Sequence, residues 1–113
     1  METAIVLGPA ATLQIERGSV FLRHGGFYIR SKDTTIRFDG ADAHLNGEAF
    51  FSIEKPQQAF VRVFAGQVSV GTEPHSIVTQ DQSAQLTPFR LATHPVIQPA
   101  WGPRALELLH AQK

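Results

Sequence analysis

The residues that could do chemistry in this chain are five histidines, ten carboxylates and six serines. Histidines bind metals when two lie on one helical face or form an HxH pair on a strand, and no such spacing occurs here. No serine lies in a G-x-S-x-G motif, which would present it as a nucleophile on a sharp turn. We therefore predict neither a metal site nor a serine nucleophile. The histidines are His24, His44, His75, His94 and His110.

The carboxylates and the paired glycines give no catalytic set either. Glu48 and Glu54 fall on one predicted strand, where their separation of roughly 20 Å is too large for a catalytic pair. Gly25-Gly26 lacks the preceding strand and following helix that a phosphate-binding loop needs. We predict a hairpin turn at Gly25-Gly26, because two glycines between apolar runs commonly connect strands. The chain is accordingly predicted to be no enzyme and to need no cofactor.

The composition limits the class of protein. A chain of 113 residues has room for one domain. Ten Lys and Arg balance ten Asp and Glu, and the basic residues are scattered, so we exclude a nucleic-acid binder. The absence of cysteine suits the cytosol and the periplasm equally.

The start of the sequence lacks the features of a secretory signal. Glu2 is acidic, and the apolar run before Gly8-Pro9 is only four residues long. No apolar stretch approaches the roughly 20 residues that span a bilayer. We therefore predict no direct membrane insertion of this chain, and a periplasmic location would require a targeting segment in a longer parent chain.

The stretch HLNGEAFFSIEK at 44–55 has the periodicity of a strand with one buried face. Apolar residues recur at every second position in Ala49, Phe51 and Ile53. Phe50 and Phe51 must point to opposite faces, so one of them is either covered by a second layer or exposed as a contact surface. We expect cover, because large exposed apolar patches are uncommon.

A glycine interrupts three similar segments, which are LQIERGSVFL at 13–22, AHLNGEAFFSI at 43–53 and VRVFAGQVSV at 61–70. The first and third segments form a weak internal repeat. Each glycine is consistent with a tight hairpin, a bulge or a sharp bend where the strand changes sheets. The sequence leaves these three alternatives open.

The remaining segments complete a β-rich pattern. Runs at 27–31 and 34–38 are joined by Lys32-Asp33, and the turn signal Asp39-Gly40 follows them. Runs at 75–79 and 84–88 lie on either side of Asp81. We predict an all-β fold in residues 1–100, with glycine-punctuated short antiparallel strands in a sandwich, a roll or an irregular solenoid.

The last segment, residues 101–113, predicts a short C-terminal helix or the start of a linker. Pro103 suits the first position of a helix, and Lys113 suits its end. The helix could dock on the sheet, begin a further domain, or be captured by a partner protein. In the last case Trp101, Leu106 and Leu109 are the candidate protein-binding residues.

The segment AHLNGEAFFSIEKPQQAFVRV resembles the signature of the FecR-like domain, the extracytoplasmic region of membrane-bound sigma-factor regulators. The resemblance covers about residues 34–88. Two alignments of residues 65–88 remain open, one placing VSVGT and the other AGQVSV on a family strand. The motif residues, which the resemblance implies are structural, are Gly47, Glu48, Ala49, Phe51, Ile53, Phe60 and Gly66.

The resemblance implies a glycine-turned β architecture, a periplasmic location and a role in relaying a signal from an outer-membrane transporter to a sigma factor. It implies a protein partner and no catalysis. Our first hypothesis is therefore a non-catalytic signalling module that meets its partner through a strand edge or its C-terminal segment. The alternative is a self-assembling β-solenoid scaffold, which the unequal spacing of the three glycines disfavours. A small barrel enzyme or ligand binder is the third hypothesis, and the oligomeric state is not predicted.

Overall fold

A computed structural model describes residues 3–16, 19–38, 41–55, 58–71, 77–86, 89–92 and 99–111. These residues form one antiparallel β-sheet and one α-helix at the C-terminal end, which confirms the predicted all-β class with a short helix. The elements are β1 Ala4–Leu7, β2 Thr12–Glu16, β3 Ser19–Phe38, β4 Ala41–Lys55, β5 Gln58–Val70, β6 Ile77–Thr79, β7 Ser83–Leu86, β8 Phe89–Leu91 and α1 Gly102–Ala111.

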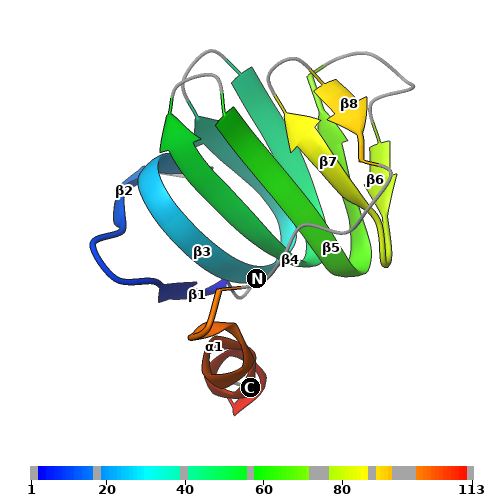
Figure 1. The fold of residues 1–113 in the computed structure, drawn as a ribbon. Coiled ribbons are helices and arrows are strands. Elements are labelled where there is room, and N and C mark those ends of the chain that lie inside the picture. The colour runs from blue at the N-terminus through cyan, green and yellow to red at the C-terminus, as the bar shows by residue number, and fades with distance from the viewer. Residues whose placement is uncertain are drawn as a thin grey trace.

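Three long strands form the centre of the sheet, and short strands line both sides of this centre (Figure 1). The order is β1-β3-β4-β5-β7-β8, with β2 also pairing β3 and β6 also pairing β5. β1 and β2 therefore lie one after the other along β3, and β6 and β7 lie in the same way along β5. All pairings are antiparallel, and strands that follow each other in the chain pair at β2–β3, β3–β4, β4–β5, β5–β6 and β7–β8, as in a meander.

The central strands are longer than the sequence predicts. β3 has 20 residues and β4 has 15, because the expected breaks within them are bends rather than turns. The predicted hairpin at Gly25-Gly26 is wrong, since both glycines lie inside β3 and pair with β4. Lys32-Asp33 likewise interrupts one strand as a bulge instead of separating two.

The three glycine segments adopt two different structures. The segment at 13–22 is a hairpin in which Ile15 of β2 lies opposite Val20 of β3, and its glycine lies outside the described residues. Gly47 and Gly66 lie within β4 and β5, directly opposite each other. The weak internal repeat therefore has no structural counterpart.

A line of positive backbone angles crosses the sheet and creases it. Asp33 has φ 68°, Gly47 141°, Gly66 77° and Asp81 67°, on or beside four adjacent strand segments. The amide of Asp81 donates to the carbonyl of Val63 in β5 at 2.8 Å, which places the last bend beside that of Gly66. Because the bends coincide, the strands change direction together and their pairing continues on both sides.

A second crease lies nearer the N-terminus. Ala10, between β1 and β2, has φ 58°, and Gly25 of β3 has φ 109°. The amide of Gly8 donates to the carbonyl of Gly26 at 2.9 Å, which keeps the two segments together through the bend.

The creases roll the sheet around one main core, so of the three predicted arrangements the structure adopts a roll (Figure 1). Arg37 near the end of β3 reaches Glu16 of β2 at 4.0 Å, and Glu16 pairs with Ser19 at the start of β3, so the two ends of β3 lie close to each other. The inner face supplies the largest fully buried apolar side chains, among them Phe27, Phe51 and Leu22.

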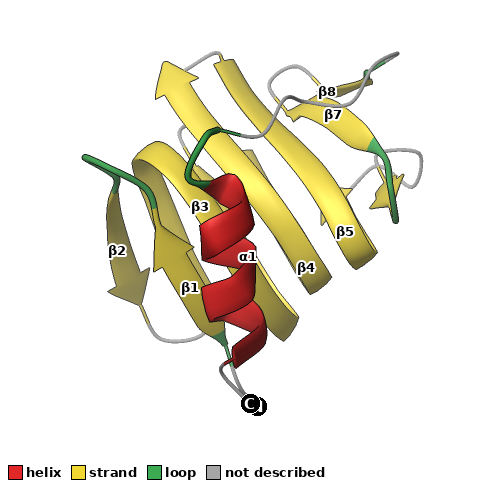
Figure 2. Cartoon of the chain, turned by 60° about the horizontal axis from the view of Figure 1, so that its bottom comes forward, coloured by secondary structure: helices red, strands yellow, loops and turns green. Residues whose placement is uncertain are grey.

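The outer face carries a second, smaller apolar cluster that α1 covers (Figure 2). We name it the outer cluster, and its buried members are Ala4, Tyr28, Phe50, Ala105 and Leu109. Phe51 lies in the main core and Phe50 in the outer cluster, which confirms that both adjacent phenylalanines are covered from opposite sides.

The crease gives a matched test at two glycines with similar backbone angles. A Cβ at Gly66 (φ +77°) would lie 2.0 Å from the carbonyl oxygen of Asn46, whereas a Cβ at Gly71 (φ +66°) meets no atom within 4 Å. We expect Gly71→Ala to lower the free energy of unfolding by about 1 kcal/mol through backbone strain alone. Gly66→Ala should cost about 2 kcal/mol more, because the β4 backbone must also move. Urea unfolding of both variants measures this difference, and equal losses would show that the close approach does not matter.

Candidate functional site

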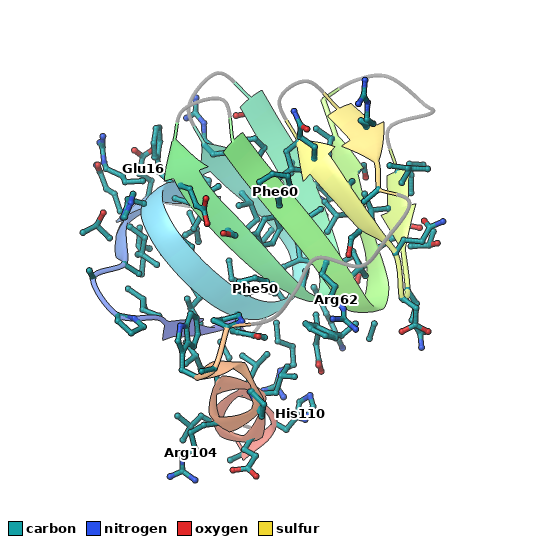
Figure 3. The ribbon with its side chains drawn as sticks, in the orientation of Figure 1. Glu16, Phe50, Phe60, Arg62, Arg104 and His110 are labelled. Carbon is teal, nitrogen blue, oxygen red and sulfur yellow. The ribbon has the colours of Figure 1, made fainter. Side chains whose placement is uncertain are left out.

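Aromatic rings gather on the outer face around Tyr28. Its ring centroid lies 4.7 Å from that of Phe50, 6.0 Å from that of Phe64 and 5.4 Å from that of Trp101. The Trp101 ring stands nearly perpendicular to Tyr28, at 80°, which is a favoured edge-to-face arrangement. Figure 3 shows Phe50 between the sheet and the helix. Three strands and Trp101, the residue before α1, thus contribute to one apolar contact.

Trp101 lies in a slot made by two glycines. A Cβ at Gly8 would lie 2.2 Å from Cζ2 of the indole, and one at Gly26 would lie 2.7 Å from the same atom. Any side chain at these positions would displace the indole. The sequence gives no sign of this contact, because Gly8 and Trp101 are far apart in the chain and their spacing follows no motif.

Helix α1 is attached to the sheet by apolar and polar contacts. Ala105 and Leu109 are buried and Leu106 packs against the outer cluster. At the other end, Nε2 of His110 donates to Oε1 of Glu48 at 2.7 Å, which ties the last turn of α1 to β4. The structure therefore has the helix docked on its own sheet, the first of the three predicted alternatives.

The candidate protein-binding residues Trp101, Leu106 and Leu109 all face this contact. Leu109 is fully buried, while Trp101 and Leu106 are partly buried. In this arrangement they bind the chain's own sheet, so binding of a partner by these side chains would require α1 to leave. That role stays a prediction.

The seven motif residues lie along β4 and β5. Gly47 and Gly66 form the crease, and Glu48 follows it with its contact to His110. Three motif residues are buried and face the main core, namely Ala49, Phe51 and Ile53. Phe60 lies on the outer face of β5, opposite Ser52 (Figure 3).

Burial raises the pKa of Tyr28 to about 12, and the nearby positive charge of Arg62 opposes this effect in part. The guanidinium of Arg62 also lies 5.3 Å from the ring centroid of Phe64. The neutral phenol is therefore the stable form of Tyr28 within the outer cluster.

Three hydroxyl groups meet where β1 joins β3. The Thr3 hydroxyl lies 2.9 Å from that of Ser31 and 3.3 Å from that of Thr34, and Ser31 and Thr34 also hydrogen-bond each other. Ser31 and Thr34 are buried. The cluster satisfies the polar side chains at the bulge of β3, and no base among the described residues hydrogen-bonds to it.

One exposed histidine has an acidic partner. Nε2 of His44 in β4 contacts a carboxylate oxygen of Asp33, the residue at the bulge of β3. Thr35 and Ser69 lie opposite His44 on the neighbouring strands. Both side chains are exposed to solvent, which weakens the contact between them. Among the described residues, no group of three or more histidines and carboxylates is placed to hold a metal ion.

The most exposed large hydrophobic side chain of the described residues is that of Ile15 in β2, which is 71% accessible. Within the described part of the chain β2 pairs only with β3, so its other side is a free edge. We name this free side the β2 edge. Sequence reasoning missed it, because Leu13 and Ile15 alternate just as buried strand residues do.

No family model and no curated protein matches the chain. No helix among the described residues is long and apolar enough to cross a membrane.

The raised pKa of Tyr28 predicts a loss of stability at alkaline pH. The unfolded chain ionises its tyrosine near pH 10, whereas the folded chain keeps the proton until about pH 12. The folded state thus binds more protons in this window, and the free energy of unfolding must fall as the pH rises through it.

Urea unfolding at about pH 9 and about pH 11.5 tests this window. The wild-type chain should lose more stability between the two pH values than Tyr28→Phe, which removes the single tyrosine of the sequence. Equal losses in both proteins would show that another group causes the alkaline effect.

Proposed function

We propose that this chain is a non-catalytic protein-interaction module of the FecR-like kind, which relays a signal by accepting a strand of a partner protein at the β2 edge. The observation that carries the proposal is the free edge with its exposed Ile15. Backbone N–H and C=O groups of an unpaired strand give affinity to an added strand, and side chains give specificity.

The composition of β2 supports this use of the edge. Proteins usually protect free edges with lysine, proline or very short strands, and Thr12–Glu16 contains neither lysine nor proline. Four of its five residues are exposed, and the fifth, Leu13, packs against the main core. A partner strand would therefore find an accessible backbone on a firmly held template.

The resemblance to the FecR-like domain supports the kind of partner. It implies a periplasmic location and, as partner, the signalling domain of an outer-membrane transporter. The sigma-factor role would then belong to the parent protein.

Isothermal titration with purified periplasmic signalling domains of transporters from the same genome tests the proposal. We expect saturable binding by one of them, weakened about tenfold or more by Ile15→Lys, which places a charge where an apolar contact forms. Leu91→Lys is the matched control, because Leu91 is exposed on β8 at the opposite end of the sheet. Absence of binding by every such domain would contradict the signalling function.

The alternative, a self-assembling scaffold, has one observation in its favour. The open sheet has free edges at both ends, at β1 and β2 on one side and at β8 on the other. Pairing of one edge with the unlike edge of the next copy would add copies without limit. The described strands form a meander, however, and not the regular stacked coils of a solenoid.

Sedimentation velocity across a wide concentration range separates the two functions. A signalling module should form no species larger than a dimer at any concentration. A scaffold should grow into ever larger assemblies as the concentration rises. Such growth would replace the signalling function with the structural one.

A further inference from the structure

We propose that two copies of this chain pair through their β2 edges as a symmetric antiparallel dimer centred on Gln14. The inference rests on the proposed function insofar as both use the same free edge, and it names a second copy of the chain as an occupant of that edge. The dimer would continue the sheet from β3 and β2 of one copy into β2 and β3 of the other.

The faces of β2 restrict which pairings are possible. Leu13 lies opposite Leu22 and Ile15 opposite Val20, and both residues of β3 belong to the main core. Leu13 and Ile15 therefore point to the inner face, since directly opposite residues share a face. Thr12, Gln14 and Glu16 point to the outer face by alternation. In a symmetric antiparallel pair, apolar side chains lie opposite apolar side chains only when the two-fold axis passes beside one residue, which then pairs with its own copy. An axis midway between two successive residues would place inward-facing residues opposite outward-facing ones.

Among the axes through a residue, the one at Gln14 fits the strand best. It pairs all five residues of β2 with the five of the second copy, whereas an axis at Leu13 or Ile15 leaves residues unpaired at both ends. It places Ile15 opposite Leu13 of the second copy, so that each exposed Ile15 gains an apolar neighbour. It also keeps the two Glu16 carboxylates four positions apart, roughly 13 Å along the strand, which avoids like-charge repulsion.

The dimer must be weak and readily reversible. Five residues on each side bury much less surface than the roughly 800 Å² per partner of a standard stable interface. Because a partner strand would use the same edge, dimer formation and partner binding exclude each other.

Disulfide trapping tests the register, because the chain has no cysteine of its own. Residues directly opposite in an antiparallel pair have Cα atoms about 4.5–5.5 Å apart, which lies within the range that a disulfide spans. We expect Gln14→Cys to form a covalent dimer under mild oxidation with diamide, resolved on a non-reducing gel. Gln14 is exposed and its bond to Arg23 lies at the surface, so the variant should fold.

Two further single-cysteine variants are the controls. Glu16→Cys lies on the same exposed strand, but its symmetric copy is roughly 13 Å away, beyond the reach of a disulfide. Arg90→Cys is exposed on β8 and reports pairing through the opposite edge. Faster trapping of Gln14→Cys than of both controls supports the dimer. Equal rates for Gln14→Cys and Glu16→Cys, or faster trapping of Arg90→Cys, would overturn it.

Sedimentation equilibrium of the cysteine-free chain gives an independent measurement. Ile15→Lys should raise the dimer dissociation constant about tenfold, while Leu91→Lys should leave it unchanged. An equal effect of both substitutions would overturn pairing at the β2 edge. Binding of a transporter domain without trapping of Gln14→Cys would refute the dimer and leave the proposed function standing. Trapping of Gln14→Cys without binding of any transporter domain would support the dimer and refute the proposed function.

Discussion

The close approach of the β4 and β5 backbones at Gly47 and Gly66 is the constraint on which the rest of the fold depends. A Cβ on Gly47 would lie 2.0 Å from the carbonyl oxygen of Ala65, and one on Gly66 would lie 2.0 Å from that of Asn46. Both residues also have positive φ angles, so glycine is required twice over at this point. The sheet can therefore bend sharply without losing strand pairing. The bend brings side chains from both halves of the central strands, such as Phe51 and Val68, into one main core.

The bend has a consequence on the outer face of the sheet. Inward-facing side chains converge and fill the core, while Tyr28, Phe50 and Phe64 remain on the convex side and need a separate cover. Helix α1 provides it, with Trp101 in the slot between Gly8 and Gly26. Glu48, the residue after Gly47, reaches His110 at the far end of the helix. The position of the helix is thus set by the same crease that shapes the core.

The sequence predicts well whatever depends on local alternation. It indicated β strands around Phe51, the burial of both Phe50 and Phe51, and a terminal helix, because each of these follows from the spacing of apolar residues along one segment. It could not distinguish a turn from a bend at glycine, since both need the same backbone freedom. Gly25-Gly26 was mistaken for a hairpin for this reason, as the neighbouring strand that decides the matter is β4. Contacts between distant segments, such as Gly8 with Trp101, leave no periodic signal at all.

The exposure of Ile15 follows from the lengths of the strands around it. β4 pairs with β3 only from Gly25 onward, so the first six residues of β3 extend past β4 and pair with β2 on their other side. Val20 and Leu22 on this extension still reach the main core and are buried. Ile15 lies one strand further out, beyond the side chains that could cover it, although it points to the same face. The apolar alternation of the sequence thus extends one strand beyond the buried core, to β2. A strand added at the β2 edge would cover Ile15.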